Sequence, residues 1–499
     1  MDRVVEKRVR ALVQACARDG SKFTDPDFGP NDSDEDGAKA LYGDPPVPPG
    51  PVGASAYPKP EGLRWDRPRY PDPEMGQDGT GGKAASDGGD NDVDGDEYVD
   101  DDEDDEFAER RPEVWCKKGR LFVNGSASGD VVQGALGDCW FLGALSVVAT
   151  REELLRQVFW RGETWRDLGL YVCRFHKDAA WRFVVIDDRI PCFDNRDGNP
   201  VFARCRDPNE LWAPLVEKAY AKLHGCYKSL IGGYVHYGVS DLTGFAPRLL
   251  VLKRGHQGFH DDCADDDVWR RLRLYRNWRC LMGCSIQQPP GADLKAHEAE
   301  AGQGLRMMHA YALVDANEGQ RHCVRLLRLR NPWGHGEWTG AWSDGDPWRQ
   351  KYDAAIQAVF GVSAAERTEI DQVGKFALSL FVSLPFRLRG LMDGTFFMCF
   401  SDWLEHFSHL FVGLDFPDLW DGQRAKGRWD DDSGGNRELK TFSSNPKMLL
   451  ELPHEADVFV GLAVHDTRLS MGNDYFRAPL QQVRLTNVMG RTLELGGPP

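Results

Sequence analysis

The sequence predicts an α+β fold in which helices dominate the first half of the globular region and strands dominate the second. Two segments predict helices: the apolar run 139–149, and residues 210–225, whose apolar positions recur at helical spacing. Residues 308–316 and 322–329 alternate as strands do and are joined by the turn "NEGQ". A further strand is predicted at 181–188, where "WRFVVIDD" is rich in β-branched residues.

Length, charge and cysteine usage limit the class of protein. The chain has 499 residues, enough for about two to four domains. Lys and Arg total 61 against 78 Asp and Glu, and the formal charge of −17 disfavours nucleic acid as a partner. The 12 cysteines form no C-x-x-C pair, which favours free thiols in a reducing compartment. Because neither a signal-peptide core nor an apolar run of ~18 to 20 residues is present, a soluble, cytoplasmic protein is predicted.

Residues 1–74 are predicted to form an N-terminal helix and a Pro-rich segment that leads into the globular region. Residues 4–16 have the pattern of a short amphipathic helix. The loop "FTDPDFGPND" follows, with Phe23 and Phe28 as aromatic anchors, and residues 45–73 are rich in Pro and Gly, which favours extended chain.

Residues 75–111 form a predicted acidic, disordered insert. The stretch 86–105 holds 12 acidic residues and no Lys or Arg, so most of the excess charge is local. Within it, "DNDVDGDEYVDD" places aspartates at positions 1, 3 and 5 of a calcium-loop template, but position 12 is Asp101 rather than Glu. A solvated insert is therefore favoured over a calcium loop.

Cys139 begins the apolar helix at 139–149, where its thiol has a chemical use. Helix N-terminal N–H groups and the helix dipole stabilise a thiolate. Attack on a carbonyl then requires a base that can carry the proton and a group that orients the base. The alternative is an inert buried cysteine, which is common in apolar runs.

His309 and Asn331 are the candidate partners of that thiol. His309 stands at the start of the strand at 308–316, and Asn331 follows the next strand in "RNPWG". An Asn amide can accept a hydrogen bond from an imidazole N–H and hold the ring in orientation. A structural histidine and an ordinary Asn-Pro turn are the alternatives. However, Cys, His and Asn in this order, each at an element boundary, resemble the papain-type arrangement.

Six ordered motifs resemble the calpain protease core. They are "QGALGDCWFLGAL", "WRFVVIDDRIP", "ELWAPLVEKAYAKLHGCY", "MHAYALVDA", "RLRNPWGHGEWTGAWSD" and "DGTFFMCFSDWLEHF". The resemblance covers about residues 22 to 412, apart from the acidic insert, and continues weakly beyond. It implies a two-lobed, papain-like cysteine protease core with a helical first lobe at 112–244 and a β-rich second lobe at 245–412. A small or partial β-sandwich is expected at 413–499.

The same resemblance implies a role for each catalytic residue. Cys139 would be the nucleophile, His309 the general base and then acid, and Asn331 the group that orients the imidazole. Gln133 matches the oxyanion-hole glutamine, and Trp333 matches the tryptophan between the two lobes. Because these residues are divided between the lobes, the site would form only when the lobes close on each other.

Calcium is the implied driver of that closure, with one ion in each lobe. Calcium takes six to eight oxygen ligands, from carboxylates and main-chain carbonyls. The implied ligands are Val123, Gly125, Asp130 and Glu210 in the first lobe and Glu337, Asp344, Leu391 and Asp393 in the second. Thr395 stands where the family commonly has an acidic ligand, and Met308 where it usually has Gly before the catalytic His.

The resulting functional prediction is a calcium-dependent cysteine endopeptidase that performs limited proteolysis of intracellular proteins. A calcium-responsive scaffold with weak or no catalysis is the alternative, since Met308 and Thr395 depart from the family. Transglutaminase is a rival class, but it orients its His with Asp rather than with Asn. The tail shows no EF-hand pattern, so no obligatory EF-hand subunit is expected, and calcium-dependent lipid or partner contact through the β-sandwich is left open.

Overall fold

A computed structural model describes the greater part of the chain. It covers residues 2–30, 37–43, 63–69, 116–178, 180–193, 199–256, 265–288, 299–318, 324–347 and 394–417, with isolated residues elsewhere. The acidic insert 75–111 lies outside the described residues, as do Gly319 and Gln320 of the turn, most of 45–73 and nearly all of 413–499. No helix within the described ranges combines the length and the apolar composition that a membrane crossing requires.

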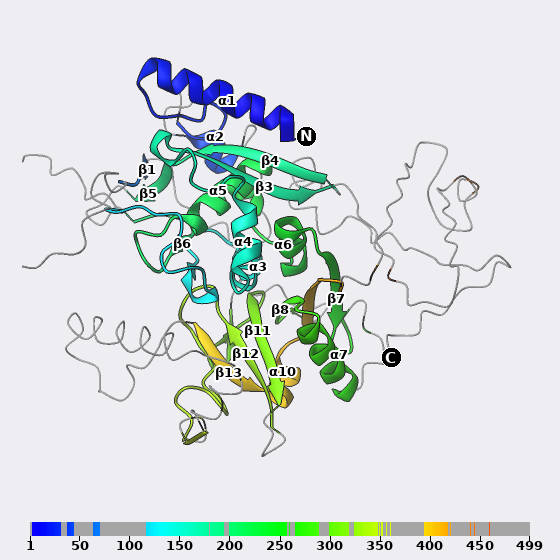
Figure 1. The fold of residues 1–499 in the computed structure, drawn as a ribbon. Helices are drawn as coiled ribbons and strands as arrows, with labels where there is room; N and C mark the ends of the chain where they lie inside the picture. Colours follow the sequence, from blue (N-terminus) through cyan, green and yellow to red (C-terminus); the bar gives the residue numbers. More distant parts are fainter. Residues whose placement is uncertain are drawn as a thin grey trace, which may run out of the picture.

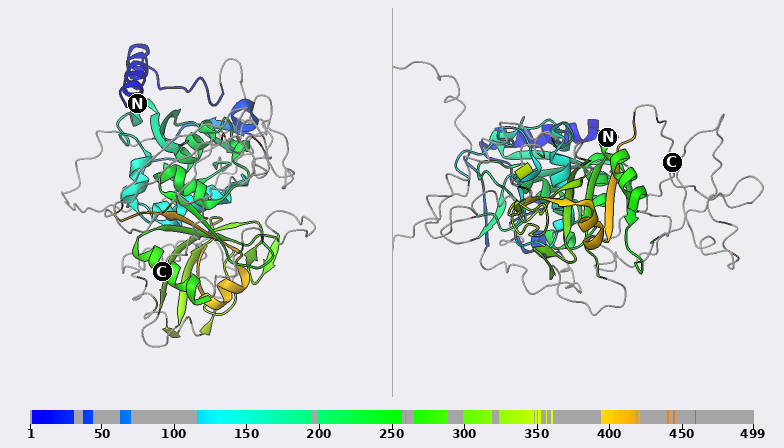
Figure 2. Two further views of the ribbon diagram at one scale, coloured as in Figure 1. Left: turned by 90° about the vertical axis from the view of Figure 1, so that its right-hand side faces the viewer. Right: turned by 90° about the horizontal axis from the view of Figure 1, so that it is seen from below.

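Residues 116–245 form a part of the fold that we call the helical part (Figures 1 and 2). Its helices are α3 (Cys139–Ala149), α4 (Glu152–Val158), α5 (Trp212–Leu223) and α6 (Val235–Thr243). Its strands are β2 (Val131–Val132), β3 (Leu170–Lys177), β4 (Ala180–Asp187), β5 (Ile190–Phe193) and β6 (Arg204–Cys205), of which β3 pairs with β4 and β2 with β6. The predicted helices at 139–149 and 210–225 and the strand at 181–188 are confirmed.

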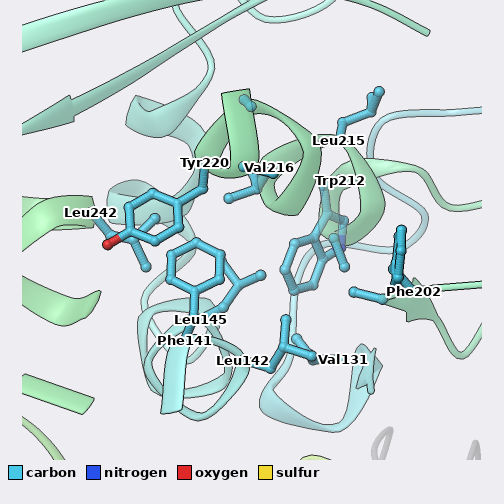
Figure 3. Packing of buried hydrophobic residues seen from close by; sticks show 14 of the residues in the cluster. Val131, Phe141, Leu142, Leu145, Phe202, Trp212, Leu215, Val216, Tyr220 and Leu242 are labelled. Carbon is cyan, nitrogen blue, oxygen red and sulfur yellow. The ribbon is translucent and has the colours of Figure 1, made fainter. Parts of the chain in front are cut away.

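Helix α3 contributes most of its residues to the core of the helical part. All its residues are buried, as its continuous apolar sequence predicts. The ring of Phe141 stacks on Tyr220 of α5 with the centroids 4.0 Å apart, and Figure 3 shows this pair among the apolar side chains of α3 and α5. Gly238 lets α6 approach α3 closely, since an added Cβ would lie only 2.7 Å from the Cβ of Ala144.

The described residues between 246 and 414 form what we call the sheet part. Its six-stranded antiparallel sheet has the order β13-β12-β11-β8-β14-β7. These strands are β7 (Ala246–Val251), β8 (Leu281–Ser285), β11 (Ala310–Glu318), β12 (Arg325–Arg330), β13 (Thr395–Cys399) and β14 (His409–Leu414). Helices α7 (Asp265–Asn277) and α10 (Phe400–His406) and the short pair β9 (Glu300–Gly302) and β10 (Leu305–Arg306) also belong to it.

The two faces of the sheet belong to different hydrophobic cores. Along β11, Ala310 and Ala312 join the core of the helical part, whereas Tyr311 and Leu313 join a second core with α7 and α10. This division follows from the two-residue repeat of a strand, which sends successive side chains to opposite faces. The predicted strands at 308–316 and 322–329 are confirmed, although β11 begins at Ala310, so that His309 precedes the strand instead of starting it.

The N-terminal segment packs on the helical part. The predicted helix at 4–16 is confirmed as α1 (Asp2–Asp19), which lies over β3 and β4 in Figure 1 and shares a small core with them. The anchors Phe23 and Phe28 are both buried. The segment also includes the short helix α2 (Ala38–Tyr42) and the strand β1 (Leu63–Asp66), which pairs with β5.

Buried ion pairs fix the loop that follows α1. Lys222 Nζ donates to both carboxylate oxygens of Asp25 at 2.6 and 2.7 Å, and Lys218 Nζ donates to Asp187 at 2.5 Å. The Asp25 N–H also donates to Asp187 at 2.8 Å. Removal of Lys222 would therefore leave the buried Asp25 carboxylate without its ammonium partner, which is costly. Asp187 would keep a partner if Lys218 were lost, because Arg189 Nε donates to it at 2.8 Å.

Met308 adopts a left-handed backbone conformation with φ 53°. This region costs a residue with a side chain roughly 1–2 kcal/mol. The conformation is held by the Met308 N–H, which donates to the Ile286 carbonyl at 2.7 Å. Met308 therefore places backbone strain directly before His309.

His236 lies where α6 packs on β14. It is 5 % exposed, and its ring stacks on Phe411 with the centroids 5.3 Å apart. Burial, followed by the nearby His409, lowers the pKa of His236 to about 3. The histidine is therefore neutral in the folded protein at neutral pH, whereas an unfolded chain takes up a proton below about pH 6.5.

Replacement of Met308 by Gly is expected to raise the free energy of unfolding by about 1 kcal/mol, because Gly adopts positive φ without the steric cost. Urea unfolding would measure the difference. Met307→Gly is the matched control: Met307 packs against the core of the sheet part, and its backbone is not left-handed, so this change should destabilise. A loss of stability in Met308→Gly would show that the side chain contributes more than the backbone conformation costs.

The folded protein is expected to lose stability as the pH falls below about 6.5, because the folded-state pKa of His236 lies below its unfolded value. At pH 5 this residue accounts for about 2 kcal/mol of the loss. The difference between the unfolding midpoints at pH 7.5 and pH 5.0 should therefore be smaller in His236→Phe than in the unmodified chain. His335→Phe, the same change at an exposed position, should leave the pH dependence unaltered.

Candidate active site

Cys139 is the first residue of α3 and is 4 % exposed. The helix begins here because Asp138 has a non-helical conformation, with φ −109° and ψ 27°. The N–H groups of Phe141 and Leu142 bond the Asp138 carbonyl, which closes the first turn. The thiol thus lies at the helix terminus where N–H groups favour negative charge, as the sequence predicts.

His309 and Asn331 are directly hydrogen-bonded. His309 Nε2 lies 2.8 Å from Asn331 Oδ1, and both residues are buried. The Asn331 carboxamide is fixed from both ends: its Nδ2 donates to the Gly336 carbonyl at 3.0 Å, and its Oδ1 also accepts the Trp333 N–H at 3.1 Å. Asn331 therefore cannot turn its oxygen away from the imidazole without losing three bonds.

This arrangement sets the tautomer of His309. Because Asn331 Oδ1 can only accept, Nε2 carries the proton in their hydrogen bond. Nδ1 of the neutral ring then keeps a lone pair that can take a proton. The imidazole is thereby oriented, and Nδ1 is the nitrogen at which it can act as a base.

The N-terminal half of α3 lies beside the start of β11. Helix α3 packs against β11 and β8. A Cβ added to Gly143, one turn after Cys139, would lie 3.9 Å from the Cβ of Ala310, the neighbour of His309. The fold thus brings Cys139 of the helical part and His309 of the sheet part to the same end of the interface between the two parts.

Trp333 and Gln133 lie at the same interface. The Trp333 ring is 4.9 Å from the His309 ring, and it shields one side of the imidazole from water. The Gln133 N–H donates to the Pro332 carbonyl at 2.9 Å, which ties the helical part to the loop that carries Asn331. One N–H of the Gln133 side chain donates to the Leu136 carbonyl at 2.7 Å, and the amide has a second N–H to offer.

A carboxyl pair lies behind Cys139, and the sequence reasoning missed its second member. Asp138 and Glu217 of α5 are both buried. Burial first, and then the charge of Asp138, raises the pKa of Glu217 well above its usual range, while the Ala203 N–H acts in the opposite direction. Glu217 is thus protonated and can donate to Asp138, which leaves one negative charge rather than two. A Glu inside the apolar periodicity of 210–225 was the signal that could have revealed the pair.

The predicted ligands of the first calcium ion gather around one loop. Glu210 Oε1 accepts the Val123 N–H at 2.9 Å, and Asp130 Oδ2 accepts the Ala127 N–H at 2.6 Å. Burial is the main cause that raises the pKa of Glu210 to about 8; the bond from Val123 opposes this rise, and the charge of Asp130 contributes to it. Two adjacent carboxylates that repel each other suit a divalent cation. This donor set, with the main chain of Val123 and Gly125, fits calcium.

The predicted second set is only partly described. Glu337 Oε1 accepts the Gly394 N–H at 2.8 Å, and the Gly394 carbonyl accepts the Asn331 N–H at 2.7 Å. Asp344 is described and half-buried, whereas Leu391 and Asp393 lie outside the described residues. Across the described ranges, no three or more His, Cys, Asp or Glu side chains gather as metal ligands. The first set has two carboxylates and would depend on carbonyls for the remaining bonds.

A cavity of about 380 Å³ lies at the opposite end of α3 from Cys139. Arg151, Arg276 and Arg279 border it, but they are paired with Asp415, Asp315 and Glu153. The charges in and around it therefore balance. We place the candidate active site at the N-terminus of α3, where the imidazole and its orienting amide lie.

Comparisons with known proteins point to the same chemistry. The family described as calpain family cysteine protease matches residues 96–370. The mouse calpain-2 catalytic subunit is 31% identical over 361 residues, which cover 69% of this chain and 46% of that protein. The chicken calpain-1 catalytic subunit is 33% identical over 365 residues, covering 70% and 46%, and human calpain-8 is 32% identical over 359 residues, covering 69% and 45%.

The matched region of this chain thus spans slightly under half the length of these relatives. Residues 96–370 make up more than half of the chain itself, and they include Cys139, His309 and Asn331. With the α+β core and the bonded His309 and Asn331 described above, this match identifies the chain as a member of the calpain family of cysteine proteases.

Proposed function

We propose that this chain is a calcium-dependent cysteine endopeptidase that makes limited cuts in flexible segments of other cytoplasmic proteins. The observation that carries the proposal is the bond between His309 Nε2 and Asn331 Oδ1, next to the N-terminus of α3. A fixed imidazole whose second nitrogen can accept a proton is what a thiol nucleophile requires. Membership of the calpain family supports the same reaction class.

In this proposal, the Cys139 thiol gives its proton to His309 Nδ1, and the sulfur attacks the carbonyl carbon of a peptide bond. The second N–H of Gln133 and the Cys139 N–H stabilise the oxyanion of the tetrahedral intermediate, and one such donor typically contributes ~3 kcal/mol. His309 then protonates the departing amine, and a thioester remains. Water, deprotonated by His309, hydrolyses the thioester and releases the second product.

We assign the helical part and the sheet part to the two lobes of a papain-like core, with domain limits at 112–244 and 245–412. The interface between them carries Gln133 and Cys139 on one side and His309, Asn331 and Trp333 on the other. A protein substrate would bind across this interface. Residues 413–499 remain predicted as a partial β-sandwich, and we propose this segment as the site of calcium-dependent contact with lipid or a partner.

We propose that Asp130 and Glu210, with the carbonyls of Val123 and Gly125, hold one calcium ion, and that Glu337, Asp344, Leu391 and Asp393 hold a second. Bound calcium supplies positive charge between carboxylates that otherwise repel each other. The raised pKa of Glu210, to about 8 through burial and the nearby Asp130, supports the first assignment. Thr395 removes one acidic position from the second set, which should weaken it.

A calcium-responsive scaffold without catalysis is the second candidate. The left-handed conformation of Met308 favours it, because a side chain there adjoins His309 in a position that the family usually gives to Gly. Both candidates bind calcium, and only the peptidase has a reactive thiol. Transglutaminase chemistry is disfavoured, since the residue bonded to His309 is Asn331 rather than Asp.

Replacement of Cys139 by Ala is expected to reduce cleavage of an unfolded casein substrate by at least about 10⁴-fold, since the nucleophile is lost. The melting temperature should change little, because the thiol is small and only one heavy atom is removed. Cys399→Ala, at a half-buried thiol of β13, is the matched control and should keep full activity. Cleavage by Cys139→Ala at the rate of the unmodified chain would reject the nucleophile assignment.

Chelation of calcium is expected to silence cleavage and the labelling of Cys139 by an epoxide thiol inhibitor. Glu210→Gln should raise the calcium concentration that gives half-maximal activity by about tenfold, because one ligand charge is lost. Glu405→Gln, at an exposed acid, serves as the control. Calcium that raises the melting temperature without any labelling of Cys139 would favour the scaffold over the peptidase.

A further inference from the structure

Arg330 is a buried cation at the interface between the two parts. It is the last residue of β12, and its exposed fraction is 0%. Its main chain is held on both sides, since it pairs with Ala312 of β11 and with Thr395 of β13. The backbone position of Arg330 is therefore set by the sheet part alone.

Its side chain, in contrast, reaches into the helical part. One guanidinium nitrogen donates to the carbonyls of Gly129 and Val131, at 3.0 and 2.5 Å. The residue between them is Asp130, one of the proposed calcium ligands. Another nitrogen donates to Ser146 Oγ at 3.2 Å, and Ser146 lies on α3, two turns after Cys139.

The carbonyl-bearing loop is held from its other side by the helical part. The Arg206 N–H donates to the Asp130 carbonyl at 2.8 Å, and Val131 pairs with Cys205. The Ser126 hydroxyl donates to the Ala149 carbonyl at the end of α3, at 3.0 Å. Arg330 is consequently a residue of the sheet part whose side chain bonds the main chain on both sides of Asp130.

We propose that Arg330 is a positioning residue that couples the first calcium loop to the catalytic residues, an inference that rests on the proposed function. A shift of the 129–131 loop on calcium binding moves the guanidinium, and Arg330 is bonded directly to Asn331 in the chain. The same guanidinium bonds α3, which carries Cys139. Occupation of the calcium loop is thereby transmitted to the nucleophile helix and to the residue that orients His309.

The guanidinium group is suited to this task by its geometry. Its five N–H donors point in fixed directions, so that one side chain binds two carbonyls and a hydroxyl at once. Lysine keeps the charge but has one nitrogen, and it cannot hold the same three acceptors in the same positions. Arg330→Lys therefore weakens the coupling while it preserves the buried charge.

Coupling between two sites is reciprocal. If Arg330 links calcium binding to the active arrangement of the thiol, its replacement must alter both the calcium affinity and the calcium-dependent reactivity of Cys139. A residue with a purely structural role would lower the melting temperature and leave these two quantities in place. The two roles can thus be separated by experiment.

The test uses the full chain in four forms: unmodified, Arg330→Lys, Ser146→Ala and Arg328→Lys. Arg328 lies on the same strand and is the matched control. Calcium is titrated with two readouts, the rise in melting temperature, which reports binding, and the rate at which an epoxide thiol inhibitor labels Cys139. For Arg330→Lys, the calcium midpoint should rise and the labelling rate at saturating calcium should fall, each by about fivefold or more.

Ser146→Ala should shift both quantities in the same direction by about twofold, since it removes one of three bonds, and Arg328→Lys should match the unmodified chain. Arg330→Lys with a lower melting temperature but an unchanged midpoint and labelling rate would overturn the inference. If Arg330→Lys fails to fold, the inference is overturned instead by a Ser146→Ala variant whose calcium midpoint and labelling rate equal those of the unmodified chain. An unmodified chain that does not respond to calcium would reject the proposed function itself, which is a separate result.

Discussion

The burial of helix α3 on all sides is the constraint on which the rest of the molecule depends. Its residues from Cys139 to Ala149 are all covered, and no single layer of structure can cover a whole helix. Helices α5 and α6 cover it from within the helical part, and β11 and β8 cover it from the sheet part. The two parts are therefore packed together by the same helix whose first residue is the candidate nucleophile.

Much of the fold could be predicted from local pattern. The helix at 139–149 has the bounds that its apolar run indicates, and the alternating segments around 308–316 and 322–329 are neighbouring strands. The bonded pair of His309 and Asn331 was a hypothesis based on their positions at element boundaries, and the structure places their side chains 2.8 Å apart. Local pattern works here because burial and strand alternation leave a direct record in the residue order.

Other features depend on contacts between distant segments and leave no such record. Asp138 and Glu217 meet only because α5 packs behind the start of α3. In the sequence, Arg330 is one of three arginines in "RLLRLRN", and nothing there distinguishes it from the other two. The left-handed conformation of Met308 is similarly invisible, since nothing in its side chain favours positive φ. The calcium assignments came from the resemblance to the calpain family, and that resemblance did not reveal that Asp130 and Glu210 lie close enough to shift a pKa.

Gly394 has a consequence for how this sequence can vary. Its N–H donates to Glu337, and its carbonyl accepts the Asn331 N–H. Its φ is 80°, and an added Cβ would lie 2.5 Å from the Asn331 carbonyl oxygen. The position therefore admits no side chain. Any missense change at this codon would push apart the loops on either side, whatever the chemistry of the new residue. Loss of function there would be a steric effect and would reveal nothing about charge, metal or nucleophile.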